Sequence, residues 1–401
     1  MYITRPDGKV VEIDEPEQIQ GLLSRAGWRQ SNEEEIAHYN IEKNHMIALT
    51  ERKEGEAGGE NSVYYQSVGS SPDGYGMSRD ILKYELLEKG ILLEEEFANQ
   101  KVGLLYSYPT GITHMRNDVR LIMTMFESDK IPQDWPDYLA SADEVIVPSK
   151  WCHDTFLRAG IDTTIVPLGY NDRVFKYIER QLPLDTKKPF TFIHYNSLNH
   201  RKGFSEVFKA FTEEFKKNEP VKLILKSTDR RPPIPIMKDI YPNIDVICEH
   251  MTEAELMELL GTADCMLYPS RGEGFGITPL EGMATGLPAI VPNAHGISEY
   301  FNANYMLEVK ADERCPGLYQ RFKGEDVGEM VICDVKDLRR QMRYAYEHQA
   351  EMHELGKSAS EYVKKYTYRN TADALGKIIT KWQEAEIVKR GDSKFLQVDK
   401  I

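Results

Sequence analysis

The sequence has few of the features that would assign it to a specialised class of proteins. Its 401 residues contain five cysteines, which lie far apart and form no C-x-x-C pair, so neither a disulfide framework nor a zinc site is indicated. No run approaches the roughly 20 apolar residues of a membrane-spanning helix, and residues 1–14 lack the apolar core of a secretory signal. We therefore expect a cytoplasmic protein with reduced thiols and without stable membrane insertion.

Basic residues are in the minority. Lys and Arg number 50 against 64 Asp and Glu, which gives a net charge of −14. This balance argues against nucleic acid or an anionic membrane covering the whole surface, although a local basic groove is compatible with it. The 41% of apolar and 28% of charged residues are ordinary for a globular protein, and the length predicts two or three domains.

Short apolar runs alternate with helical periods along most of the chain, which predicts βαβ units and parallel sheets covered on both faces. We predict an α/β protein with two doubly wound, Rossmann-like domains, 61–180 and 181–370, that face a central cleft. Residues 1–60 are predicted to be an N-terminal appendage and linker, and 371–401 a C-terminal helix that could cross back to the first domain. The predicted strands are 62–68, 102–107, 120–126, 144–148, 164–168, 190–195, 221–226, 245–248, 265–268 and 289–291. The predicted helices are 77–90, 151–159, 204–215, 253–261, 279–285, 336–348, 350–366 and 371–388.

The most informative segment is a glycine-rich turn after the predicted strand 265–268. Three glycines in residues 272–276 would let the backbone approach a ligand, and a helix is predicted to begin with Thr278 as N-cap and Pro279 as first residue. The start of a helix offers free N–H groups and the positive end of its dipole, which suits a diphosphate. On local grounds alone, an ordinary tight loop fits equally well.

Two glutamates bracket this turn. Glu273 lies on the turn itself, and Glu281 lies on the first turn of the predicted helix. A ligand-binding role for Glu281 competes with a structural one, because Thr278-x-x-Glu281 matches a capping box. The local sequence leaves both roles open.

A longer pattern runs through these residues. Glu273-Gly-Phe-Gly-x-x-x-x-Glu281, followed by Ala284-x-Gly286-x-Pro288, resembles the signature of retaining glycosyltransferases with the GT-B fold. The likeness is greatest to family four, the glycosyl transferases group 1, and it extends over roughly residues 62–390. This signature is longer and more specific than a lone glycine motif.

The resemblance assigns roles to the residues of the turn. It implies that Glu273 contacts the donor sugar and that Glu281 binds the ribose hydroxyls. The donor-binding residues that it implies between the two acids are Phe275, Gly276, Ile277 and Thr278, with the last three on the diphosphate.

Two further loops resemble donor-binding segments of the family. Gly74 and Gly76 lie where a helix opens after the first strand, like the glycine loop that faces the donor phosphate. Arg201 and Lys202 resemble the basic segment that neutralises the diphosphate. Ser197 stands where the family often has an arginine, so Arg201 is a candidate substitute. A solvated basic loop is the alternative.

Glu127 follows the predicted strand 120–126, where many relatives of this type carry a histidine beside the sugar. The resemblance therefore implies a substrate contact and makes Glu127 a candidate catalytic residue together with Glu273. The alternative is a structural acid that caps the following loop. His114 is the nearest histidine in sequence and is more typical of a surface or core position.

The resemblance implies transfer of a hexose from a UDP- or GDP-linked sugar to an acceptor hydroxyl, with retention of configuration. Basic side chains and helix dipoles would meet the leaving diphosphate, so neither a metal nor a cofactor is expected. The acceptor could be a glycan, a small molecule, a lipid or a modified nucleic-acid base. Two alternatives stay open: a sugar-nucleotide-binding or assembly protein without turnover, and an epimerase or phosphorylase on the same fold.

Overall fold

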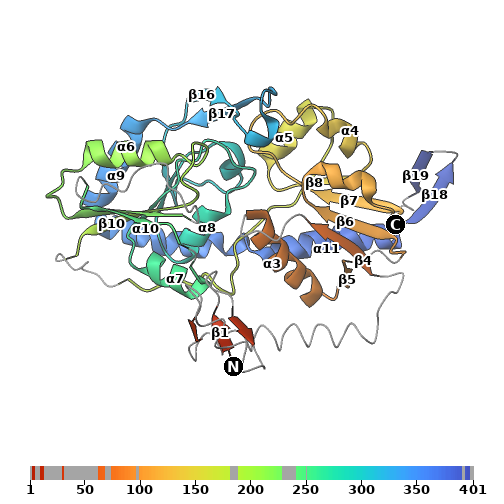
Figure 1. Cartoon of the computed structure of the whole chain (residues 1–401), viewed down its shortest axis with the longest axis horizontal. Coiled ribbons are helices and arrows are strands. Elements are labelled where there is room, and N and C mark those ends of the chain that lie inside the picture. The colour runs from red at the N-terminus through yellow and green to blue at the C-terminus, as the bar shows by residue number, and fades with distance from the viewer. Residues whose placement is uncertain are drawn as a thin grey trace.

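Two parallel sheets of six strands each form the framework of the molecule and lie along its long axis (Figure 1). This architecture comes from a computed structural model, which describes residues 2–4, 10–12, 29–30, 62–67, 74–95, 99–180, 188–227, 241–249, 251–390 and 393–397. The sheets fall within the predicted ranges 61–180 and 181–370. The predicted fold class, α/β with two Rossmann-like units, is confirmed, while the domain boundaries stay predictions.

The N-terminal sheet has the strand order β5-β4-β6-β7-β8-β9, with every pair parallel. Its central strands are buried along nearly their whole length, as expected for a sheet covered on both faces. The strands are β4 (Val63–Ser67), β5 (Leu93–Glu94), β6 (Val102–Tyr106), β7 (Val119–Met123), β8 (Glu144–Val147) and β9 (Thr164–Ile165), and the helices of this domain are α3 (Gly74–Glu88), α4 (Trp135–Leu139) and α5 (Lys150–Arg158).

The C-terminal sheet has the strand order β12-β11-β10-β13-β14-β15, again all parallel. In this order the chain reverses direction across the sheet between β10 and β13, and open α/β sheets bind ligands beyond the carboxyl ends of the strands at such a point. The strands are β10 (Phe190–Tyr195), β11 (Val221–Lys226), β12 (Ile244–Ile247), β13 (Cys265–Leu267), β14 (Ala289–Val291) and β15 (Leu307–Glu308), and the helices are α6 (Phe204–Glu214), α7 (Glu253–Gly261), α8 (Ile277–Ala284), α9 (Val335–Glu347) and α10 (Gln349–Tyr362).

A last long helix, α11 (Tyr368–Glu384), returns from the C-terminal domain and packs on α3 of the N-terminal one (Figure 1). Tyr368 donates a hydrogen bond to Ser78 in α3, and Trp382 donates its indole N–H to Glu144 at the start of β8. Helix α11 therefore ties the end of the chain to the first domain.

Several elements differ from the expectations. The predicted helix 371–388 ends at Glu384, and β18 (Glu386–Arg390) follows it and pairs with β19 (Ser393–Gln397). The predicted strand 120–126 ends at Met123, so residues 124–126 belong to a loop. An antiparallel hairpin, β16 (Glu313–Pro316) with β17 (Glu329–Ile332), was not predicted.

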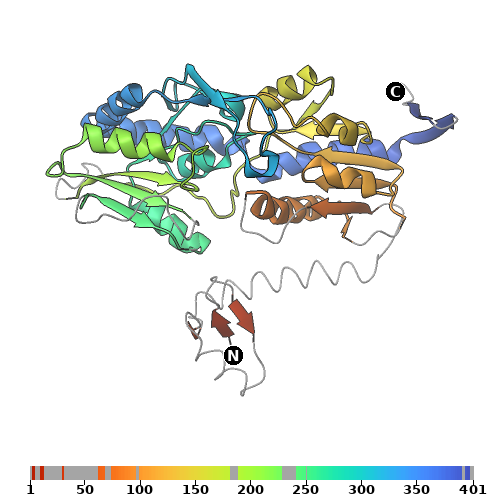
Figure 2. The ribbon, with the colours of Figure 1, turned by 45° about the horizontal axis from the view of Figure 1, so that its top comes forward.

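The predicted appendage, 1–60, contains a small antiparallel sheet. Its strands are β1 (Tyr2–Thr4), β2 (Val10–Glu12) and β3 (Arg29–Gln30), and Figure 2 shows them apart from both large sheets. The rest of 1–60 lies outside the described residues. Within the part of the chain that the structure describes, no helix is both long and apolar enough to cross a membrane.

Candidate active site between the two domains

The glycine-rich turn leaves β13 and enters α8 through a residue in a left-handed conformation. Gly276, at a φ of +86°, is the N-cap of α8, so Thr278 and Pro279 are the second and third helical residues rather than the cap and the first. The predicted helix start was wrong because only a glycine readily adopts this backbone conformation. A capping box between Thr278 and Glu281 is excluded with it. Gly286, at a φ of +85°, ends the helix as predicted.

Two glycines of the turn bring the domains together. A Cβ atom on Gly272 would lie 2.1 Å from the backbone oxygen of Glu127, and one on Gly274 would lie 2.7 Å from the Cβ of Met125. Ser149, at the start of α5, also donates a hydrogen bond of 2.8 Å to the backbone oxygen of Gly274. The turn therefore packs directly on the N-terminal domain, so these glycines permit close contact between domains.

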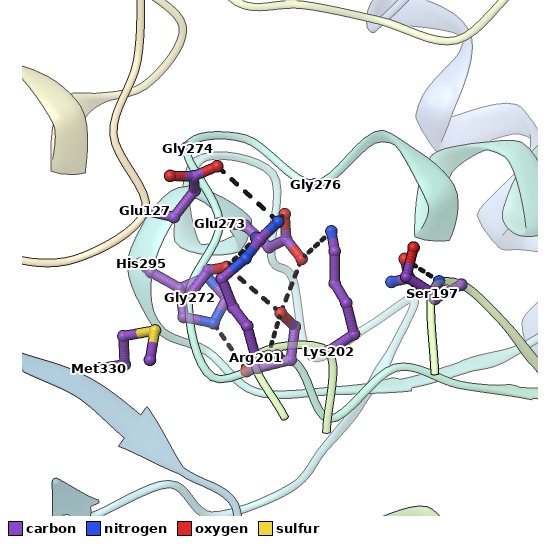
Figure 3. Close-up of polar contacts among 12 residues, drawn as sticks. Glu127, Ser197, Arg201, Lys202, Gly272, Glu273, Gly274, Gly276, His295 and Met330 are labelled. Carbon is purple, nitrogen blue, oxygen red and sulfur yellow. Dashed lines mark hydrogen bonds and ion pairs between the residues drawn. The ribbon is translucent and has the colours of Figure 1, made fainter. Parts of the chain in front are cut away.

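The carboxylate of Glu273 lies beneath this contact, with its side chain only 8% exposed. Its Oε1 accepts from Lys202 Nζ at 2.7 Å (Figure 3). The same oxygen accepts from Tyr268 Oη at 2.9 Å and Ser270 Oγ at 2.7 Å. Its Oε2 lies 3.3 Å from Nη1 of Arg201. Both predicted basic residues thus converge on one of the two predicted catalytic acids.

Opposite charges decide the ionisation of this cluster. Burial alone would raise the pKa of Glu273, but Lys202 and Arg201 outweigh it and lower the pKa to about 2. Burial and the neighbouring Arg201 lower the pKa of Lys202, partly offset by the carboxylate of Glu273. Glu273 is therefore ionised near neutral pH.

Arg201 spans the junction between the domains. Its Nη1 donates to the backbone oxygen of Gly272 at 2.7 Å, and its Nη2 lies 3.8 Å from Oε1 of Glu127 (Figure 3). Burial lowers the pKa of this guanidinium, but Glu127 and Glu273 more than reverse that effect. Glu127 belongs to the N-terminal domain and Glu273 to the C-terminal one, so Arg201 links the two predicted catalytic acids.

The elements that carry the other predicted residues are as follows. Gly74 and Gly76 form the first turn of α3, and Ile277 opens α8. The ring of Phe275 is buried in the core and packs on Tyr300 at 5.5 Å, so only its backbone is available to a donor.

Glu281 and His114 have different surroundings. Glu281 is half-buried in α8, where its negative charge adds to the effect of burial in raising the pKa of Tyr368. His114 is an exposed surface residue, as expected.

Sequence reasoning missed three residues that hold the turn: Tyr268, Ser270 and His295. His295 is buried, has a φ of +43°, and its Nε2 lies 3.0 Å from the backbone oxygen of Ser270, to which it must donate. Burial lowers the pKa of His295 to about 4, so the ring is neutral. The next residue, Gly296, donates its N–H to the backbone oxygen of Glu273 at 2.8 Å. The positive φ of His295 is the feature that marks this residue as unusual, and it can be seen only in the structure.

Among the residues that the structure describes, no group of three His, Cys, Asp or Glu side chains could hold a metal ion.

The sequence of the second domain matches a known family. Residues 176–313 match the family model of the glycosyl transferases group 1, a segment that runs from before β10 to the start of β16. ORF313 of Acidianus filamentous virus 1, itself a predicted glycosyltransferase, is 25% identical over 227 residues, which cover 55% of this chain and 66% of the viral protein, just under two thirds of it.

Solved structures share the arrangement of both domains. The sucrose-phosphate synthase of Thermosynechococcus elongatus has a TM-score of 0.60 at 15% identity, covering 80% of this chain and 98% of that one. An Anabaena protein crystallised with UDP-glucose has a TM-score of 0.55 at 11% identity, covering 80% and 99%. The fold is thus the GT-B fold. With the family match, these likenesses confirm the predicted resemblance to the group 1 glycosyltransferases.

The buried network around Glu273 makes a first prediction. Glu273→Gln keeps the shape but leaves two buried cations without this carboxylate, so the free energy of unfolding at pH 7 should fall by about 3–5 kcal/mol. Folding lowers the pKa of Glu273 from 4.5 to about 2, so the ionised carboxylate stabilises the folded wild type fully at pH values above about 4.5. This contribution is lost as the pH falls towards 2. The difference in the free energy of unfolding between wild type and Glu273→Gln should therefore become smaller as the pH falls from about 4.5 towards 2.

Urea unfolding between pH 7 and pH 3 measures this gap. Glu213→Gln is the control, because Glu213 pairs with Arg339 at the exposed surface and should change stability by less than about 1 kcal/mol. If the difference in unfolding free energy between wild type and Glu273→Gln does not depend on pH, the charge of Glu273 is not what stabilises the turn.

Proposed function

We propose that the protein is a retaining glycosyltransferase that moves a hexose from a nucleotide diphosphate sugar to an acceptor hydroxyl without a metal ion. One observation carries this proposal: the loop bearing Arg201 and Lys202 follows β10, the turn bearing Glu273 follows β13, and these strands flank the reversal point of the sheet. Glu127 faces this place from the other domain.

The leaving diphosphate needs positive charge, which this site can supply in two forms. The ammonium of Lys202 has three N–H groups. One donates to the carboxylate of Glu273, and a second can donate to Oη of Tyr268 at 3.5 Å. The third can meet a phosphate oxygen. The N-terminal end of α8, with Gly276 as its cap, adds free N–H groups and the positive end of a dipole.

The sugar that loses its leaving group develops positive charge. Glu273 and Glu127 are carboxylate side chains on the two sides of the junction, so both can stabilise an oxocarbenium-like transition state electrostatically. Attack from the side of the leaving group retains the configuration, and an oxygen of the departing phosphate can take the proton of the acceptor hydroxyl. No side chain needs to act as a nucleophile in this scheme.

The Anabaena protein of the same fold was crystallised with UDP-glucose, so UDP-linked hexoses are the first donors to test, followed by GDP-linked ones. A panel of these donors with EDTA present, assayed for free nucleoside diphosphate, tests the proposal. Slow hydrolysis or transfer supports it. Nucleotide binding without release of diphosphate, across a broad screen of acceptors, would instead favour a sugar-nucleotide-binding protein without turnover.

Lys202 should recognise the diphosphate rather than the nucleoside. Lys202→Ala is expected to weaken binding of UDP by about 1.5–3 kcal/mol, the worth of a charge-assisted hydrogen bond, and to change binding of uridine far less. Calorimetry with the two ligands measures the difference, and Lys209→Ala, an exposed lysine of α6, is the control. Equal losses for UDP and uridine would contradict the role of Lys202.

The resemblance to the family implies that Glu281 binds the ribose, and the N-cap at Gly276 leaves its side chain without a capping role. Glu281→Gln is expected to melt close to wild type, yet to bind UDP more weakly by about 1.5–3 kcal/mol. The loss should shrink for a 2′,3′-dideoxy nucleotide, which lacks the hydroxyls that the carboxylate would accept from. The exposed Glu361→Gln serves as control. A variant that keeps the full preference for ribose over dideoxyribose would rule out this contact.

A further inference from the structure

A segment of the C-terminal domain reaches across to the N-terminal one. We name residues 313–332 the strap: it comprises the antiparallel strands β16 and β17 and the residues 317–328 that join them (Figure 1). The match to the group 1 family model ends at residue 313, so nearly all of the strap lies outside it.

The tip of the strap completes a hydrophobic core of the other domain. Val327 is 1% exposed and belongs to the same cluster as Phe126 and Trp135. The rings of Tyr319 and Phe322 lie 5.2 Å and 5.8 Å from the ring of Phe126. Separating the domains would draw these apolar side chains out of a packed core, which is unfavourable in water.

Hydrogen bonds fix the two residues that follow Glu127. Ser128 Oγ donates to the backbone oxygen of Val327 at 2.6 Å. Asp129 N donates to the backbone oxygen of Glu329 at 3.1 Å, and Glu329 N donates to Oδ1 of Asp129 at 2.6 Å. The backbone just after Glu127 is thus held by the strap.

The base of the strap holds the glycine turn as well. Val331 N donates to the backbone oxygen of Arg271 at 2.9 Å, and the side chain of Met330 lies 3.1 Å from the place of a Cβ on Gly272. One short hairpin therefore contacts both the turn that carries Glu273 and the loop that carries Glu127.

The strap also brings a side chain near the charged cluster. Burial, and after it the negative charge of Glu127, raise the pKa of Tyr319, while Arg201 acts in the opposite direction. The Tyr319 hydroxyl is therefore close enough to Glu127 and Arg201 for their charges to shift its pKa.

We propose that the strap is a positioning element, which holds the loop bearing Glu127 against the glycine turn before any substrate binds. The two acids of the site then face each other across Arg201 without a closing motion driven by the donor. The catalytic part of this inference rests on the proposed function, whereas the docking of the strap can be tested without it.

The functional test compares four variants. Val327→Ala removes packing at the tip, and Asp129→Ala removes the acceptor for Glu329 N. Asp129→Asn keeps an acceptor oxygen there and should restore activity. Leu318→Ser is the matched control, because Leu318 belongs to the strap but is 70% exposed.

Because small displacements of catalytic groups are costly, nucleoside diphosphate release should fall at least about tenfold in Val327→Ala and Asp129→Ala. Their affinity for UDP should stay close to wild type, since Lys202 and α8 are untouched. A merely structural strap would lower the melting temperature and leave turnover of the folded fraction unchanged. Unchanged turnover, or an equal loss of turnover and UDP affinity, would overturn the positioning role.

Hydrogen exchange measures docking independently of activity. Residues 126–133 and 313–332 should be protected in the wild type without nucleotide, equally so in Leu318→Ser, and less so in Val327→Ala. Protection that arises only when UDP is added would overturn the proposal. A wild type that is protected but releases diphosphate from no donor would support the docked strap and refute the proposed function instead.

Discussion

The buried carboxylate of Glu273 is the group on which the rest of the site depends. An ionised carboxylate that is almost wholly removed from water is tolerable only if hydrogen bonds and opposite charges replace its hydration. Here three donors converge on one of its oxygens and Arg201 approaches the other. These donors come from the loop after β10 and from the end of β13, so the carboxylate holds together the two segments that flank the reversal point of the sheet. Arg201 extends the same network to Glu127 and hence to the other domain.

This network requires that the domains approach closely, and glycines at the contact allow that approach. Gly272 and Gly274 have no side chain where the loop after β7 packs, and Gly296 presses on the backbone of Gly274 in the same way. A side chain at Gly272 would meet the backbone oxygen of Glu127 and one at Gly274 would meet the side chain of Met125, so a larger residue at either position would push the two domains apart. The conformation of His295 follows from the same crowding. A positive φ at a non-glycine residue costs energy, and it persists where surrounding contacts over-determine the backbone.

The sequence predicted the framework well for a physical reason. Strands of a sheet covered on both faces are nearly continuous apolar runs, and β10, β11 and α7 were predicted with the bounds that the structure shows. The hairpin β16–β17 escaped prediction because its first strand, Glu313–Pro316, is largely exposed and shows no alternation of apolar and polar residues. In the site, a motif was enough to single out Glu273, Arg201 and Lys202. Tyr268 and Ser270 lie only five and three residues before Glu273, but the motif gives them no role, and their contacts depend on how the turn folds back on itself. His295 reaches Ser270 from 25 residues further along the chain, which only the tertiary fold reveals.

The ion pairs of the site have a consequence for the donor binding that we propose. Lys202 and Arg201 are already paired with Glu273 and Glu127, so an incoming diphosphate meets no unpaired cluster of positive charge there. In the proposed reaction, the diphosphate would share these cations with the carboxylates of Glu273 and Glu127, which would weaken the attraction for the ground-state donor. The same arrangement would favour a transition state in which the sugar becomes positive near two acids while the leaving phosphate gains negative charge beside two bases. Differential binding of this kind is what accelerates a reaction, because uniform attraction would stabilise donor and transition state alike.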